Sequence, residues 1–223
     1  MLFPMQSLEA TLSAALNALP KRQDRSGTIG SQLCISTAQT CLHAQRTRRR
    51  QFVDGHGETN AAALVTRLPL AGETLHFVLD GTFTLANVIP IIQSHIGEPC
   101  RLTICTLGLN DATTDQLAGM LKVGTLSGLR LAMSSYFKAS DPETAAMAVT
   151  MLTQAGAVVA VERLHAKLQL WRPATSPARY VLETSSNLRS CNCVEVASLT
   201  NDARLYNWHH RWLTKFLQQN TIK

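Results

Sequence analysis

From about residue 76 onward, the chain alternates between two hydrophobic periodicities. Apolar residues recur at every second position, as is typical of strands, over residues 76–81, 101–107, 128–134, 157–171, 180–187 and 194–201. Apolar residues spaced three or four apart predict helices over residues 113–124, 141–156 and 203–219. Asp141 and Pro142 support the second helix, because an acidic N-cap followed by proline is typical of a helix start. Strands that alternate with helices predict an α/β layer architecture.

The first 75 residues follow neither pattern consistently. Residues 6–19 fit an amphipathic helix, and the Gly/Asp/Asn-rich residues 54–60 predict a loop. A basic cluster lies between these two segments and holds four arginines in five positions: Arg46, Arg48, Arg49 and Arg50. We therefore interpret residues 1–75 as a partly helical, basic N-terminal extension and residues 76–223 as the main domain.

Composition is that of a folded globular protein, with 45% hydrophobic and 16% charged residues in a chain of 223. No apolar run is long enough to cross a bilayer, and the N-terminal apolar stretch contains Glu9 and no leading basic residue. We expect no signal peptide, no stable membrane association and a cytoplasmic location. The six cysteines are dispersed and form no C-x-x-C pair, which favours reduced thiols and predicts no metal site.

Positive charge is concentrated at the two ends of the chain. The formal net charge is +6, and residues 160–223 hold nine Lys/Arg against four Asp/Glu, while residues 76–159 hold four against six. A concentrated basic region attracts phosphate-bearing partners, nucleic acid before anionic lipid. The arginine cluster at Arg46, Arg48, Arg49 and Arg50 is therefore a candidate contact for nucleic-acid phosphates.

Two strand-like segments, HAKLQLW from residue 165 and YVLETSSN from residue 180, carry an unusual number of polar groups. Alternation predicts that one strand face presents Arg163, His165, Lys167 and Gln169. An imidazole and an ammonium two positions apart lie about 6–7 Å from each other along a strand. The Ser and Asn side chains at the end of the second segment are short donors that can reach phosphate oxygens. The combination is suited to a phosphate group.

These residues resemble the phospholipase D-like, or HKD, phosphodiesterases, whose motif is H-x-K-x4-D-x6-G-S-x-N on two adjacent strands. The motif positions fall at His165, Lys167, Ser185 and Asn187. The family often adds an acidic residue on the next strand, and Glu195 stands in that place. The resemblance covers residues 76–220 and implies a mixed sheet flanked by helices.

The chain departs from the family motif at two positions. Arg172 stands at the Asp position and Thr184 at the Gly position, and the interval from His165 to Asn187 is about five residues longer. A Cβ at Thr184 would crowd the substrate phosphate. By their places in the motif region, four further residues are expected to contact the substrate: Arg163, Gln169, Arg172 and Thr184.

The resemblance implies a reaction that needs no metal and no other cofactor. A neutral His165 imidazole would attack phosphorus and form a phosphohistidine, which water then hydrolyses. Lys167, Ser185 and Asn187 would bind the non-bridging oxygens. Glu195 would fix the histidine tautomer.

A second histidine must protonate the leaving oxygen, and the sequence holds no second His-x-Lys pair. The resemblance therefore implies a homodimer in which His165 of the partner subunit is the acid. Three functions follow: a metal-independent nuclease, a catalytically weak HKD-fold module that binds DNA or supports assembly, and a phospholipid hydrolase. The basic chain ends favour nucleic acid as substrate, and the absence of an interfacial helix with a broad apolar face ranks the lipid activity last.

Overall fold

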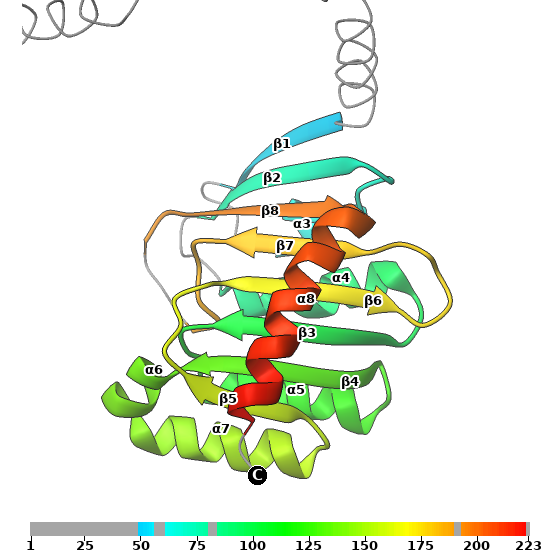
Figure 1. Cartoon of the computed structure of the whole chain (residues 1–223). Helices are drawn as coiled ribbons and strands as arrows, with labels where there is room; N and C mark the ends of the chain where they lie inside the picture. Colours follow the sequence, from blue (N-terminus) through cyan, green and yellow to red (C-terminus); the bar gives the residue numbers. More distant parts are fainter. Residues whose placement is uncertain (1–48, 56–60, 80–83, 190–192, 222–223) are drawn as a thin grey trace, which may run out of the picture. The chain divides into compact units, whose positions relative to one another are not determined.

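An eight-stranded mixed sheet is the centre of the computed structural model, which describes residues 49–55, 61–79, 84–189 and 193–221 (Figure 1). The sheet order is β1-β2-β8-β7-β6-β3-β4-β5. The strand pairs β1/β2, β3/β4 and β4/β5 are parallel, and the other four pairs are antiparallel. The strands are Arg49–Gly55 (β1), Glu73–Leu79 (β2), Cys100–Thr106 (β3), Leu126–Ser134 (β4), Val158–Glu162 (β5), Leu168–Pro173 (β6), Tyr180–Thr184 (β7) and Glu195–Asn201 (β8).

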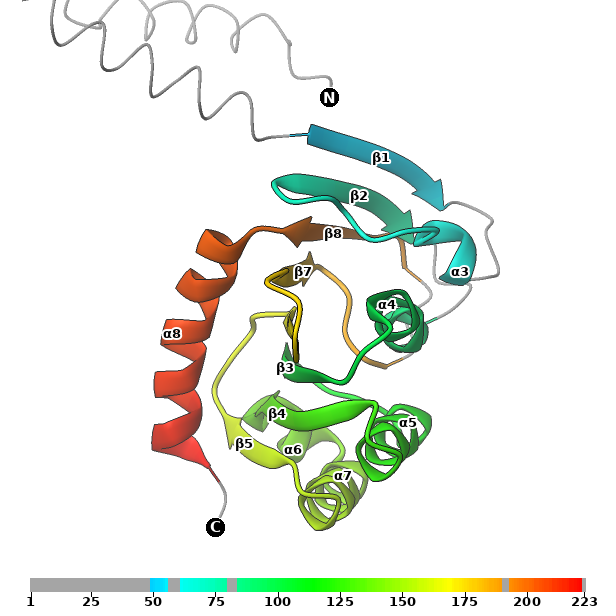
Figure 2. The same ribbon diagram turned by 90° about the vertical axis from the view of Figure 1, so that its right-hand side faces the viewer.

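Helices cover both faces of the sheet, which confirms the predicted α/β architecture with a mixed sheet flanked by helices. Among the described helices, α8 alone crosses one face, and α4, α5 and α7 lie on the opposite face (Figure 2). The helical elements are Ala61–Leu64 (α3), Leu85–Asn87 (η1), Val88–Ile96 (α4), Asp111–Lys122 (α5), Ser135–Ser140 (α6), Pro142–Gln154 (α7) and Ala203–Asn220 (α8). The three helices predicted from periodicity correspond to α5, α7 and α8.

Alternation along the strands divides the apolar side chains between two cores. In β6, Leu168 and Leu170 belong to a small cluster with Leu213 and Leu217 of α8. Trp171, one position on, belongs to the larger cluster on the opposite face, beneath α4, α5 and α7. A strand that is buried on both faces in this way reads as nearly continuous apolar sequence.

The sheet begins well before residue 76, so the predicted boundary between residues 75 and 76 falls within β2. β1 pairs in parallel with β2 over its whole length, from Arg49↔Glu73 to Gly55↔Leu79. β1 was not predicted because it is an edge strand with little apolar periodicity, and its Phe52 is 76% exposed.

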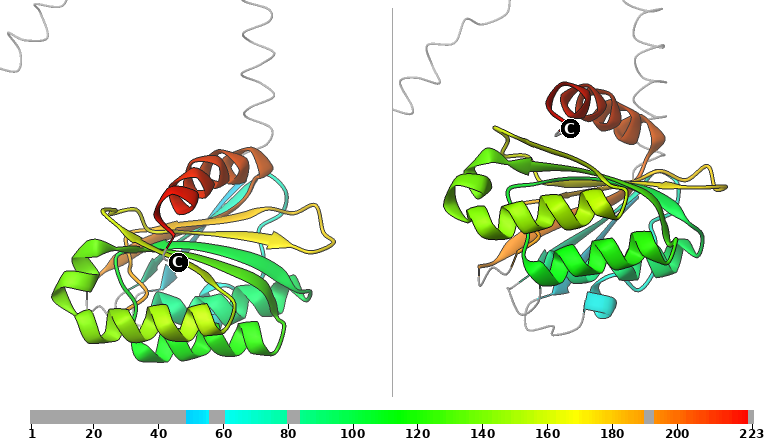
Figure 3. Two further views of the ribbon diagram at one scale, coloured as in Figure 1. Left: turned by 60° about the horizontal axis from the view of Figure 1, so that its bottom comes forward. Right: turned by 90° about the horizontal axis from the view of Figure 1, so that it is seen from below.

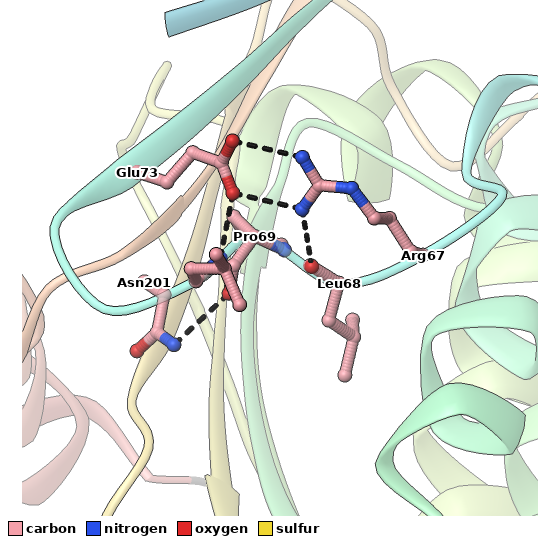
Figure 4. A network of polar contacts seen from close by, with 6 residues as sticks. Arg67, Leu68, Pro69, Glu73 and Asn201 are labelled. Carbon is pink, nitrogen blue, oxygen red and sulfur yellow. Dashed lines mark hydrogen bonds and ion pairs between the residues drawn. The ribbon is translucent and has the colours of Figure 1, made fainter. Parts of the chain in front are cut away.

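Polar contacts bind the segment before β2 to the sheet (Figure 4). The carboxylate of Glu73, which is 2% exposed, accepts two hydrogen bonds of 2.8 Å from the guanidinium of Arg67. It also accepts one of 2.7 Å from the amide of Leu70. Asn201 at the end of β8 donates from Nδ2 to the carbonyl of Pro69 at 3.0 Å. A buried carboxylate with this many donors holds the turn into β2 in one conformation.

Residues 157–171, predicted as one long strand, form two strands that are not neighbours. β5 pairs with β4 at the sheet edge, whereas β6 pairs with β3 and β7. β3 and β4 lie between them, so residues 163–167 form a connector that spans three strand spacings, about 14 Å. Alternation continues across the connector, and for that reason the pattern alone did not reveal the break.

None of the helices in the described part of the chain combines the length and the apolar character that a membrane span requires.

Candidate functional site

Most of the predicted site residues lie at one end of the strands, where β3, β4, β5 and β7 end and β6 and β8 begin (on the left in Figure 1). The register places Leu168 opposite both Cys105 and Glu183, and Thr184 opposite Ala197. The carboxyl ends of parallel strands in an α/β sheet are a usual place for ligand binding. We refer to this end of the sheet, where those strands end or begin, as the candidate site.

Ser185 and Glu195 are in direct contact at the candidate site. The hydroxyl of Ser185 donates to Oε2 of Glu195 and accepts from the amide of Val196 at 3.0 Å. Ser185 is exposed and Glu195 is half-buried. The carboxylate expected to orient His165 is therefore bound to Ser185, and the described residues show no hydrogen bond between Glu195 and His165.

Asn187 connects the segment after β7 to the end of β3. Its Oδ1 accepts from the amide of Leu107 at 3.3 Å. Next to it, the amide of Leu188 donates to Oγ1 of Thr106 at 3.3 Å. Among the described residues, none accepts from Nδ2 of Asn187, so this amide group is available to donate to a bound anion.

His165 and Lys167 lie in the connector between β5 and β6, not on a strand as predicted. The carbonyl of Lys167 accepts from the amide of Thr184 at 3.3 Å, which places the connector beside the end of β7. His165 is exposed and lines a cavity of about 770 Å³ together with Arg163 and Leu107. The other lining residues are Ser134, Ser135, Tyr136, Ala139 and Leu164.

Leu107 is common to the surroundings of His165 and Asn187, because its amide binds Asn187 and it lines the His165 cavity. Lys167 and Ser185 do not line that cavity. The fold thus brings the motif residues to the candidate site, but in two groups. His165 and Arg163 line the cavity beside α6, whereas Ser185 and Glu195 lie where β7 ends and β8 begins.

The three remaining residues predicted to contact substrate have other surroundings. Gln169 is 2% exposed on β6 and does not reach the surface. Arg172 is exposed on the α8 face, four residues beyond Leu168 and thus about 13 Å from the candidate site along the strand. The hydroxyl of Thr184 donates to the carbonyl of Val196 at 3.0 Å and accepts from the amide of Ser186 at 2.9 Å, so it stabilises the turn after β7.

The predicted nucleic-acid contacts are only partly described by the structure. Arg46 and Arg48 lie outside the described residues, and Arg49 begins β1. Arg50 is exposed and lines a polar cavity of about 570 Å³ with His76 and others from β2, β7, β8 and α8.

The titratable groups near the site show which side chains are inert and which are paired. Burial raises the pKa of the Cys105 thiol, at the end of β3, to about 12, so it is not a nucleophile at neutral pH. A hydrogen bond from His209 lowers the pKa of Glu183, one residue before Thr184. In the described part of the chain, no group of three His, Cys, Asp or Glu residues could hold a metal ion.

Sequence reasoning named Arg172 as a substrate contact but missed its grouping with Arg101 and Arg130 on the α8 face. Each arginine occurs in a different strand, so no local motif marks them. Only the register of β3, β4 and β6 brings them together.

No protein-family model and no curated protein matches the chain. Several solved structures have a similar fold. A phospholipase D family member, Nuc from Salmonella typhimurium, is 10% identical, with a TM-score of 0.48 over 67% of this chain and 95% of its own. Polyphosphate kinase from Porphyromonas gingivalis is 11% identical, with a TM-score of 0.49 over 68% of this chain and 24% of its own. Phosphatidylserine synthase from Haemophilus influenzae is 16% identical, with a TM-score of 0.44 over 67% of this chain and 39% of its own.

Proposed function

We propose that the chain is a metal-independent phosphodiesterase of the phospholipase D-like type that acts on nucleic acid as a homodimer. The observation that supports this proposal is that the motif segments meet at the candidate site. Lys167 is bonded through its carbonyl to Thr184, and the adjacent Ser185 is bonded to Glu195. Three separate segments thus meet at this end of the sheet, and between them they supply an ammonium, a hydroxyl and an amide.

In the proposed reaction, an imidazole nitrogen of His165 attacks phosphorus. A P–N bond forms, the P–O bond to the leaving group breaks, and the leaving oxygen takes a proton from His165 of the partner subunit. Lys167 and the Nδ2 amide of Asn187 donate to the non-bridging oxygens as negative charge develops. Water then attacks phosphorus and gives a proton to His165 of the partner subunit, the P–N bond breaks, and the phosphorylated end is released.

Two features of the geometry bear on how the reaction would start. His165 is on a connector, so its ring can move toward Lys167 and Asn187 without disturbing a strand ladder. The hydroxyl of Ser185 already donates to Glu195, so it contributes to phosphate binding only if that hydrogen bond is exchanged. Catalytic hydrogen bonds are often long or poorly aligned without substrate and become shorter when substrate binds.

The test is cleavage of supercoiled plasmid and of bis(p-nitrophenyl) phosphate in the presence of EDTA. Wild-type protein is expected to cleave both, and His165→Ala is expected to lose activity by a factor of about 10³ or more. His95→Ala, which removes an exposed imidazole from α4, is the matched control and is expected to retain activity. A phosphate adduct that is acid-labile and absent from His165→Ala would identify the intermediate.

The second candidate is a DNA-binding module with an inactive site, which the use of Ser185 as a partner of Glu195 favours. In that case neither the wild-type protein nor His165→Ala cleaves the substrate, and both bind DNA with an affinity that falls steeply as the salt concentration rises. Release of headgroup from phospholipid vesicles, without nucleic-acid cleavage, would instead assign the enzyme to lipid.

A further inference from the structure

A cavity of about 390 Å³ lies between α8 and the sheet, on the face opposite α4, α5 and α7. α8 passes over β6, β3 and β4 on this face, seen from the front in Figure 1 and along the sheet in Figure 3. Three arginines from these three strands line the cavity: Arg101 of β3, Arg130 of β4 and Arg172 of β6. The volume is within the range of pockets that take small ligands.

The strand register makes the three arginines neighbours on one face. Arg101 is directly opposite Arg172 across the antiparallel pair β3/β6. Arg130 is opposite Thr103, two residues along β3 from Arg101 and on the same face. Directly opposite residues have Cβ atoms about 4.5–5.5 Å apart, and like charges in that position destabilise a sheet.

No carboxylate compensates this charge among the described residues. The ion pairs in the described part of the chain involve Arg67, Arg189 and His209. Among the described residues, the cavity arginines donate one side-chain hydrogen bond, which is long and goes to a neutral acceptor, from Nη1 of Arg130 to Oγ1 of Thr214 at 3.4 Å. The guanidinium groups therefore retain most of their donors for a ligand.

α8 supplies neutral donors to the same cavity. Tyr206, His210 and Thr214 are four residues apart, so they form one stripe along the helix that faces the arginines. The rings of Tyr206 and His210 are stacked with centroids 5.6 Å apart. Burial, and then Arg130 and Arg172, lower the pKa of His210, so its imidazole is neutral at pH 7 and adds no further positive charge.

We propose that this cavity binds a phosphate group of a small anionic ligand. Guanidinium groups match phosphate oxygens in two-point contacts, and this cavity is lined by three arginines together with hydroxyl and imidazole neighbours that can also donate. A small ligand is favoured because the cavity is only about 390 Å³ and has residues of α8 on one side and of the sheet on the other. The site is on the α8 face, away from Ser185 and Asn187, and does not depend on the proposed phosphodiesterase activity.

Calorimetric titration of the full chain with inorganic pyrophosphate, a nucleoside diphosphate and a 12-nucleotide single strand tests this proposal. We expect pyrophosphate and the nucleoside diphosphate to bind, and Arg172→Gln or Arg101→Gln to weaken binding about tenfold or more. Arg211→Gln removes the same charge from an exposed position of α8 outside the cavity and is expected to leave binding unchanged.

Absence of binding by pyrophosphate and the nucleoside diphosphate would overturn the proposal. An equal loss in Arg211→Gln would do so as well, because net charge alone would then explain the affinity. Binding of the single strand alone would reassign the arginines to a nucleic-acid backbone.

Thermal unfolding gives a second readout that does not depend on the ligand. Arg101→Gln/Arg172→Gln is expected to unfold at a higher temperature than wild type in low salt, because the substitution removes the cross-strand repulsion.

Discussion

At the scale of single residues, Gln169 shows how a polar side chain in a motif region can be structural. It follows Lys167 by two positions, and alternation predicted that it would face the substrate. In the structure its side chain is buried on β6, and neither amide atom has a hydrogen-bond partner among the described residues. Burying an amide without partners costs about 1–3 kcal/mol.

We therefore expect Gln169→Leu to raise the free energy of unfolding by about 1–2 kcal/mol, because leucine has a similar volume and no polar atoms. Urea unfolding followed by circular dichroism measures this change. Gln154→Leu, at the exposed end of α7, is the control and should change the free energy by no more than about 0.5 kcal/mol. Destabilisation by Gln169→Leu would mean that the amide is hydrogen-bonded after all, for example through a buried water.

His209 on α8 shows the opposite arrangement, a buried polar group with both nitrogens satisfied. Nδ1 accepts from the indole N–H of Trp212 at 3.2 Å, and Nε2 lies 3.0 Å from Oε1 of Glu183. Because an indole nitrogen only donates, Nδ1 must be the acceptor, and Nε2 then carries the proton that Glu183 accepts. This hydrogen bond joins α8 to β7.

At the scale of elements, α8 depends on its N-cap. The carboxylate of Asp202 accepts from the amides of Arg204 at 2.6 Å and Leu205 at 3.1 Å, which satisfies two of the four free amides of the first turn. The helix has 18 residues and is the one helix in the described part of the chain that covers its face of the sheet, so its start determines where the stripe of Tyr206 and His210 lies.

Substitution of Asp202 by Ala is expected to lower the free energy of unfolding by about 1 kcal/mol, the usual cost of losing an N-cap. Chemical denaturation gives the value directly. Asp115→Ala, an exposed position within α5, is the comparison and should have little effect. If the two variants were equally stable, the cap would not contribute and the α8 start would be fixed by packing alone.

At the scale of the whole molecule, the proposed mechanism requires two chains, because each supplies a single His165. After subunit exchange in an equal mixture of wild type and His165→Ala, half of the wild-type chains are in mixed dimers. The cleavage rate per wild-type chain is then expected to fall to about half, since a mixed dimer lacks one of the two imidazoles. Sedimentation equilibrium under the same conditions establishes the dimer. An unchanged rate per wild-type chain would contradict shared sites.

Much of the fold was determined by the sequence alone. The helices α5, α7 and α8 were predicted from apolar spacing and caps, because these signals are local and survive in any tertiary context. The α/β class followed from the same periodicities. The strands β2, β3, β4, β7 and β8 were found within a few residues of their ends, since each buries at least one face and alternates accordingly.

Only the tertiary structure decided which segments are neighbours. The break between β5 and β6 is invisible to alternation, because both strands bury apolar side chains and the connector keeps the same period. The edge strand β1 lacks an apolar signal because it faces solvent. Arg101, Arg130 and Arg172 are 29 and 42 positions apart in sequence and meet only through strand register, and a register is fixed by pairing between distant segments, which a local pattern does not encode.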